Sequence, residues 1–271
     1  MEDSGEPTGA FTITLESYDG REAEVAVPSG MTKVGAHAFA NNRYIRKVVL
    51  PEGITTIGDE AFSSCVNMTE IELPSTLLFI GNGVFKGCWR LQAVSIPDGV
   101  EVLGNKVFAR CRSLASVALP EGLKVLGDAC FQHCITLQDL VLPNTLERIG
   151  QSAFYNCQKL SLSVLPERLD TIEDEAFRLC AALAELEIPE SVGWLGQRCF
   201  MDCTALLSVA LPQGLEFIEE GVFEGCSSLN AVAVPNTLSH VESRAFAGTG
   251  LAPDDIAFPE GCAIAEDAFA L

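Results

Sequence analysis

Hydrophobic and polar positions along this chain repeat in units of 23 residues, and the first half of each unit has the pattern of a strand. In one unit, Val117 and Leu119 alternate with small residues, which is typical of a half-buried strand. Pro120 ends this strand, because proline has no N–H group to donate to a sheet. Leu123 and Leu126 follow, three residues apart, and we expect both to point into the core.

The second half of the unit has the spacing of a short amphipathic helix. Gly127 would open this helix, and Asp128 would lie in its first turn, where a carboxylate interacts favourably with the helix dipole. Cys130, Phe131 and Cys134 would form its apolar face. A helix this short is not stable alone. We therefore expect Phe131 to stack on the equivalent phenylalanines of the neighbouring units.

Three residue types keep the same period along the chain, which indicates a repeat architecture. Phenylalanine recurs without a slip at Phe39, Phe62, Phe85, Phe108, Phe131, Phe154, Phe177, Phe200, Phe223, Phe246 and Phe269. Proline recurs from Pro28 to Pro235, and cysteine recurs from Cys65 to Cys226. A fixed period in this range predicts a solenoid, in which each unit buries its apolar face only against its neighbours. The predicted fold is an α/β repeat solenoid with one parallel strand and one short helix per coil.

The repeat L-x-x-V-x-L-P-x-G-L-x-x-L-G-x-x-A-F-x-x-C closely resembles the BspA-like branch of the leucine-rich repeats. Residues 137–143 (LQDLVLP) and 149–157 (IGQSAFYNC) carry the resemblance well, and it extends over residues 28–271. The resemblance implies a right-handed leucine-rich-repeat superhelix that serves binding or adhesion rather than catalysis. Many relatives of this kind are secreted surface proteins.

The two ends differ from the middle, as the terminal units of a solenoid should. Residues 1–10 are expected to be flexible. Two alternating runs, 11–15 and 23–27, flank a turn signal, so the segment 11–27 is predicted to form a β-hairpin cap. Residues 28–271 are predicted to form the solenoid, with about ten to eleven repeats, the last of them incomplete.

The acidic composition limits the partners. The chain has 37 acidic and 17 basic residues and a formal net charge of -20, so it should repel nucleic acid and anionic lipid. It contains no apolar run of 18 residues that could insert into a membrane. The charge is explained by the solubility of a scaffold with a large surface. A docking face for a basic partner is the alternative explanation.

The cysteines are predicted to belong to the core. Eight of the eleven stand three residues after a repeating phenylalanine, so they should be reduced, buried thiols. Cys130, His133 and Cys134 together could suggest a metal site. However, Cys130 falls where another repeat carries Ala153, so burial is the better explanation. The sequence has no nucleotide-binding, zinc-protease or nucleophile-elbow motif, and we expect no metal, no cofactor and no enzymatic activity.

The first residues, MEDSGEP, lack the basic region and the apolar core of a secretory signal. This favours a reducing, intracellular location in the cytoplasm. A secreted or surface-bound location would require that a leader had been removed.

Residues that break the repeat pattern are the best candidates for partner binding, because packing already explains the others. On the strand face most outward places are small, but Val141, Leu162 and Val164 form an apolar patch. The local sequence also allows a one-residue bulge that would turn Leu162 inward.

A second candidate surface lies five residues after each repeating proline. The large apolar residues at this place are Phe79, Val102, Val125, Trp194 and Phe217. Such groups either contact a partner or pack along the stack. Trp89 lies outside both surfaces and is expected to cover its neighbours.

Two classes of function remain. The first is a non-catalytic scaffold that binds another protein, as a monomer or as a component of a larger complex. The alternative is a cell-surface adhesin, or a binding module for a host protein or glycan. A removed leader or oxidised cysteines would favour the adhesin, whereas a defined intracellular complex would favour the scaffold.

Overall fold

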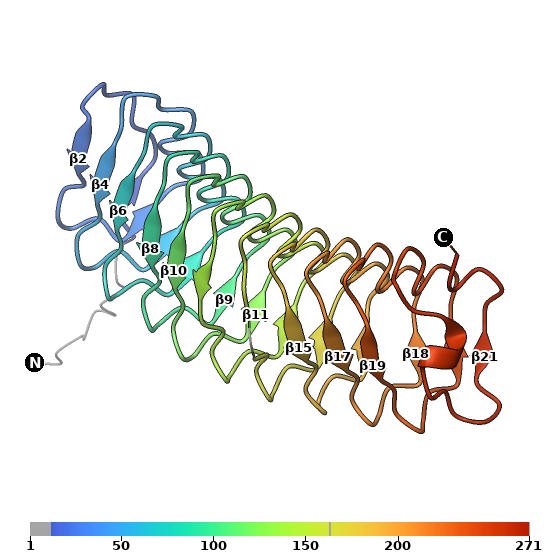
Figure 1. Ribbon diagram of the computed structural model, residues 1–271. Helices are drawn as coiled ribbons and strands as arrows, with labels where there is room; N and C mark the ends of the chain where they lie inside the picture. The colour runs from blue at the N-terminus through green and yellow to red at the C-terminus, as the bar shows by residue number, and fades with distance from the viewer. Residues whose placement is uncertain (1–11, 163, 271) are drawn as a thin grey trace, which may run out of the picture.

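Residues 12–162 and 164–270, which the computed structural model describes, form a parallel β-solenoid of leucine-rich-repeat type with about eleven turns (Figure 1). All strand pairs in this part of the chain are parallel, and each joins one coil to the next. Successive coils therefore lie side by side from the N-terminal to the C-terminal end. The apolar core runs through them as one continuous cluster.

The strands predicted before each proline form the first row. They are β2 (Glu24–Ala26), β4 (Lys47–Val49), β6 (Glu70–Glu72), β8 (Ala93–Ser95), β10 (Ser116–Ala118), β12 (Asp139–Leu140), β15 (Glu185–Glu187), β17 (Ser208–Ala210) and β19 (Ala231–Ala233). They make three sheets of three strands each, β2-β4-β6, β8-β10-β12 and β15-β17-β19. The central side chain of β10, Val117, is buried, and its neighbours are more exposed, as the alternation predicts.

A second row of strands, which the sequence did not predict, follows the proline corner. Its members are β1 (Thr14–Leu15), β3 (Lys33–Val34), β5 (Thr56–Ile57), β7 (Phe79–Ile80), β9 (Val102–Leu103), β11 (Val125–Leu126), β13 (Arg148–Ile149), β14 (Thr171–Ile172), β16 (Trp194–Leu195), β18 (Phe217–Ile218), β20 (His240–Val241) and β21 (Ala263–Ile264). The strands from β1 to β16 form a nine-stranded sheet, and β18, β20 and β21 form a further one. The prediction of one strand per coil is therefore wrong.

The short helix predicted in every coil is also wrong. The described residues contain one 3-10 helix, η1 (Pro253–Asp255), and no α-helix, so none of their helices could span a membrane. At the predicted helix, Ala129 and His133 have positive φ angles of 52° and 61°, and the equivalent places repeat this in the other coils. Left-handed residues four apart interrupt a right-handed helix and form tight turns instead.

The hydrogen bonds of this turn segment show why its spacing misleads. Cys130 N–H donates to the Gly127 carbonyl within the coil at 3.2 Å, as a turn requires. The next amide, Phe131 N–H, donates to the Ala153 carbonyl of the following coil at 2.7 Å. Successive amides thus donate alternately to a carbonyl of their own coil and to a carbonyl of the next coil. The apolar residues keep a helix-like spacing, but half of their backbone hydrogen bonds join neighbouring coils and do not form a helix.

The acidic residues of the turn segment do not interact with a helix dipole. Asp59 Oδ1 accepts a hydrogen bond from Asn82 N–H at 2.7 Å. Asn82 Oδ1 accepts from Asn105 N–H at 2.8 Å, and Asn105 Oδ1 accepts from Asp128 N–H at 2.9 Å. Each of these side chains therefore ties its coil to the next.

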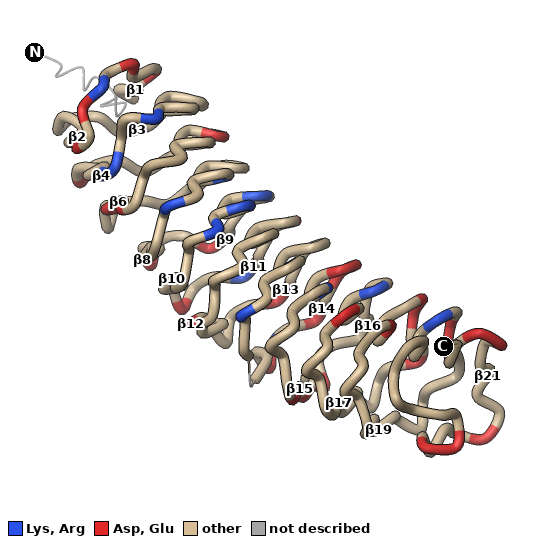
Figure 2. The backbone as a smooth tube through the Cα atoms, turned by 45° about the horizontal axis from the view of Figure 1, so that its top comes forward, with Lys and Arg blue, Asp and Glu red and all other residues tan. Residues whose placement is uncertain are grey.

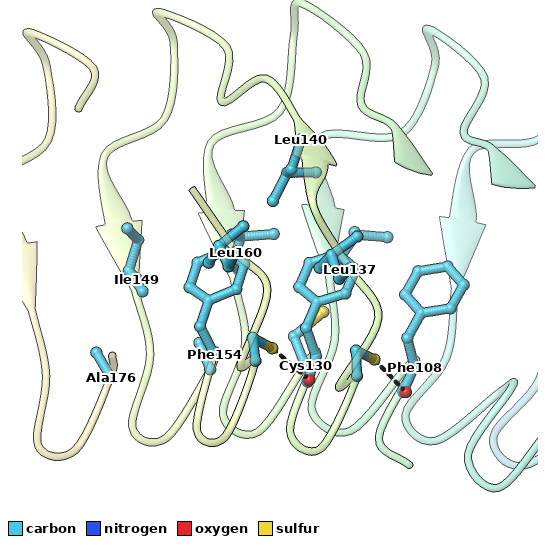
Figure 3. Close-up of a cluster of buried hydrophobic side chains, with 14 of the residues drawn as sticks. Phe108, Cys130, Leu137, Leu140, Ile149, Phe154, Leu160 and Ala176 are labelled. Carbon is cyan, nitrogen blue, oxygen red and sulfur yellow. Dashed lines mark hydrogen bonds between the residues drawn. The ribbon is translucent and has the colours of Figure 1, made fainter. Parts of the chain in front are cut away.

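The core is built on a ladder of phenylalanines. From Phe39 to Phe269 each repeating ring stacks on the next, with centroids 4.7–5.8 Å apart. Tyr18 continues the ladder at one end, 5.1 Å from Phe39, and Phe258 packs edge-on against Phe246 and Phe269 at the other. Figure 3 shows part of this ladder, in which one further ring, that of Phe131, lies between Phe108 and Phe154.

The predicted N-terminal hairpin does not form. β1 pairs with β3 and β2 pairs with β4, both in parallel, so the two segments belong to the two rows of the solenoid. Their alternation fits either arrangement, and the next coil supplies the hydrogen-bond partners that decide between them. Residues 1–10, predicted to be flexible, lie outside the described part of the chain.

Candidate functional site

The strand face presents two exposed valines on adjacent coils. Val141 is 82% exposed and Val164 is 72% exposed, whereas Leu162 is buried at 5%. Val117 and Leu140 are the inward residues of the two preceding coils, and Leu162 lies one residue before the equivalent position of its own coil. Its burial shows that Leu162 turns inward, as the sequence allowed. The assignment of Leu162 to the surface patch is therefore wrong, because the core accepts its side chain.

The sheet of the first row is interrupted at this point. In several other coils the residue before the proline donates to the next coil, as Ile96 N–H does to the Ala118 carbonyl at 2.9 Å. Among described residues 160–162 and 164–166, there is no strand and no backbone hydrogen bond of this kind. The row resumes with β15. Val141 thus lies at the edge of the β8-β10-β12 sheet, and Val164 lies in the break itself.

Three adjoining hollows open along this face. Val141 and Val164 both line the central hollow, of about 310 Å³. Val141 also lines a hollow of about 490 Å³ toward β10, and Val164 lines one of about 420 Å³ toward Pro189. We call this surface, the two valines and the residues that line the three hollows, the valine groove. The two valines are its most exposed apolar side chains.

Carboxylates surround the valine groove. They belong to Glu121, Asp139, Glu167, Glu187 and Glu190, which line one or more of the three hollows. Within the described part of the chain, none of them forms an ion pair. These carboxylates were not among the residues predicted from the sequence. The signal was present, because Glu121, Glu167 and Glu190 each follow a repeating proline directly.

The second candidate surface forms the outward row of the second sheets. Phe79, Val102 and Val125 lie on the consecutive strands β7, β9 and β11, and Val125 pairs in register with Val102. Phe79 is 56% exposed, whereas Val125 is partly buried. Leu78, beside Phe79, is also exposed and was not singled out from the sequence.

Trp194 and Phe217 form a separate part of this row. Arg148 and Thr171 lie between them and Val125, and Arg148 forms ion pairs with Asp128 and Glu173. The Phe217 ring stacks on His240 at 5.1 Å, so packing along the stack already occupies one of its faces. The five residues predicted on this row therefore do not form one continuous patch.

The cysteines offer little reactivity. All eight ladder cysteines are buried, as predicted, and are free thiols. Burial raises the pKa of Cys65 and of Cys226 to about 12, which keeps both thiols protonated at neutral pH. In residues 12–162 and 164–270 no three His, Cys, Asp or Glu side chains are grouped to hold a metal ion. Near Cys130, His133 Nδ1 accepts a hydrogen bond from Asn156 Nδ2 at 2.8 Å.

Comparison with known proteins identifies the family. The model of the BspA type leucine-rich repeat region matches residues 21–138 and 124–252. The chain belongs to this family. Leucine-rich repeat proteins of this kind are generally protein-binding or surface proteins, and their solenoids are typically non-catalytic. A comparison with curated proteins finds no significant match.

Solved structures show the same fold. A leucine-rich repeat protein from Bacteroides ovatus is 24% identical, with 83% of this chain and 76% of that one covered and a TM-score of 0.61. A leucine-rich repeat protein from Eubacterium ventriosum is 17% identical, with 96% and 88% covered and a TM-score of 0.55. At this level of identity, the likeness concerns the fold alone.

Proposed function

We propose that this BspA type leucine-rich repeat protein is a non-catalytic scaffold that binds another protein through the valine groove. The observation that carries the proposal is the exposure of Val141 and Val164, side by side at a break in the sheet. Fully burying a valine side chain contributes about 1.5–3 kcal/mol. A partner that covers both valines would gain this free energy, whereas the repeating core residues are already buried by packing.

The charges around the groove specify the partner further. Carboxylates that form no ion pair surround the two valines, so a segment with apolar side chains between lysines or arginines is complementary to the site. An acidic groove of this kind also speeds the approach of a basic partner at low ionic strength.

The test uses two double variants and a partner captured from native lysate under reducing conditions. Val141→Ser with Val164→Ser removes both apolar side chains from the groove without adding charge, and we expect it to lose the partner. Trp194→Ser with Phe217→Ser is the matched control on the second row, and we expect it to retain the partner. Thermal melting of both variants, within a few degrees of the wild type, shows that the fold is intact.

Two outcomes would contradict the proposal. Retention of the partner by the groove variant would show that the valines do not bind it. Loss of the partner by the control variant alone would move the site to the second row. Capture of an extracellular protein or a glycan would instead favour the alternative function, that of a cell-surface adhesin or binding module.

A further inference from the structure

Basic residues gather on one small area of this acidic molecule, away from the valine groove. Arg90 follows Trp89 directly, and Lys106, Arg110 and Arg112 lie in the turn segment of the next coil; all five side chains are exposed. We call these five residues the basic patch. Figure 2 shows Lys and Arg segments on the coils around β9, while Asp and Glu predominate toward β21.

The positive charges of the basic patch are not neutralised within the chain. In the described residues, none of Arg90, Lys106, Arg110 and Arg112 forms an ion pair. Seven other basic residues each pair with a carboxylate: Lys47, Lys86, Lys124, Arg148, Arg178, Arg198 and Arg244. Six basic residues outside the patch also form no ion pair within the described residues: Arg21, Lys33, Arg43, Arg46, Lys159 and Arg168. What marks the patch is therefore that four such residues lie on two adjacent coils beside an exposed tryptophan.

Contacts between the two coils hold the patch together. The Arg112 guanidinium lies over the Trp89 ring, 5.7 Å from its centroid, and Ser113 N–H donates to the Trp89 carbonyl at 3.1 Å. Trp89 nevertheless remains 50% exposed. A cation over an indole ring is attracted to it and loses rotamer freedom before any partner arrives.

His133, in the next coil, adds no positive charge to the patch. Burial, and after it the positive charges of Arg110 and Arg112, hold the pKa of His133 below its ordinary value. At neutral pH this imidazole is therefore neutral, and the charge of the patch comes from its lysine and arginines.

The composition of the patch points to a protein segment. Tryptophan and arginine are the residues most enriched among those that dominate the energy of protein interfaces. Charge complementarity requires that this segment be acidic. It must also be short, since residues 185–271 contain 14 acidic and only two basic side chains and would repel an extended polyanion. At physiological salt, screening over about 8 Å confines the attraction to the patch itself.

We propose that the basic patch docks a short Asp- and Glu-rich segment of a partner protein, which covers Trp89 and pairs with Arg110 and Arg112. The site is independent of the valine groove and selects the opposite charge. A scaffold with both sites would hold a basic and an acidic segment on different faces of one solenoid.

The experiment uses Trp89 as the reporter. Trp194→Phe leaves Trp89 as the only tryptophan of the chain, and a peptide of eight glutamates is titrated while its fluorescence is followed. We expect saturable binding that weakens steeply with salt. We expect Arg110→Glu with Arg112→Glu to raise the Kd at least about tenfold. A peptide of eight glutamines should not bind.

The matched control is Lys159→Glu with Arg168→Glu, which makes the same change in net charge at two exposed residues outside the patch. We expect it to change the Kd less than about twofold, because the removed charges are screened from the patch. Melting curves establish that each variant is folded, and Arg110→Gln with Arg112→Gln replaces the charge reversal if that variant unfolds.

Three results would overturn the proposal. Equal weakening in the control variant would show a response to net charge alone. Binding of a heparin oligosaccharide without binding of the peptide would make the patch a glycan site. Concentration-dependent dimerisation that the charge reversal abolishes would assign the patch to a second copy of the chain.

Discussion

Each ladder cysteine packs in the core and also donates a hydrogen bond. Cys134 Sγ donates to the Phe108 carbonyl at 3.1 Å, and the other seven ladder thiols repeat this contact with the phenylalanine of the coil before (Figure 3). At the two ends of the ladder, Asn42 and Thr249 occupy the cysteine position. Asn42 Nδ2 donates to the Gly20 carbonyl, and Thr249 Oγ1 donates to the Phe246 carbonyl of its own coil. The thiol is thus a small apolar group with a donor that reaches the preceding coil.

Burial of these thiols predicts a loss of stability at alkaline pH. Their folded-state pKa values lie above the unfolded value, so the unfolded chain releases protons that the folded chain keeps. This contribution is fully present below a pH of about 8.5 and is lost as pH rises toward about 12. Each thiol lowers the free energy of unfolding by up to about 1.4 kcal/mol per pH unit in this window.

Urea unfolding between pH of about 7.5 and about 9.5 measures this slope. We expect a decrease much steeper than the three tyrosines produce in the same range. Cys111→Ala should reduce the slope by about one proton, whatever it does to the stability at neutral pH. A stability that does not change up to pH of about 9.5 would contradict the buried thiol ladder.

At the scale of the element, no piece of secondary structure in this chain stands by itself. The strands have two or three residues and pair only with strands of neighbouring coils, and every second amide of the turns with left-handed residues also donates to the next coil. The close approach of the coils also restricts side chains. A Cβ atom on Gly127 would lie 2.6 Å from the carbonyl carbon of Gly104 in the preceding coil.

Gly127→Ala should therefore force two coils apart. Overpacking of this kind costs about 1–3 kcal/mol of stability, which the urea midpoint would show. Gly214→Ala is the matched control, since a Cβ atom there meets no heavy atom within 4 Å. We expect the control to change stability by less than about 0.5 kcal/mol. Similar losses in the two variants would mean that coil spacing is not limiting at Gly127.

At the scale of the whole molecule, stability depends on position along the stack. Phe131 lies between the rings of Phe108 and Phe154, at 5.3 Å and 5.4 Å. Phe269 has one stacked neighbour, Phe246 at 5.0 Å, and an edge contact with Phe258. Since each coil of a solenoid contacts only its neighbours, a defect in the middle damages two interfaces and a defect at the end damages one.

Phe131→Ala should accordingly cost about 3–5 kcal/mol in the free energy of unfolding. Phe269→Ala should cost much less, because its ring is partly exposed and the last coil can open without the rest. Hydrogen exchange would show the difference directly: the end variant should lose protection only near β21, while the central variant should lose it on both sides of β11. Equal losses would contradict nearest-neighbour stability.

The sequence by itself determined the repeat and the core. Leu123, Leu126 and Phe131 were placed inward from their period alone, and all three are fully buried. Such prediction succeeds because equivalent residues stack on one another. The surroundings of a position in one unit are therefore repeated in the other units. The exposed valines of the candidate groove were found in the same way, as large apolar residues at outward places.

Only the tertiary structure decided the local backbone and the position of Leu162. Each strand of the second row has only two residues, which is too short to show the alternation of apolar and polar side chains that predicts a strand. The turn segment looks helical until the bonds from Phe131 to the next coil are seen. Leu162 and its neighbours permit two registers, and the core selects the one that buries the leucine. In each case the deciding contacts lie one coil away, where the pattern of a single unit carries no information.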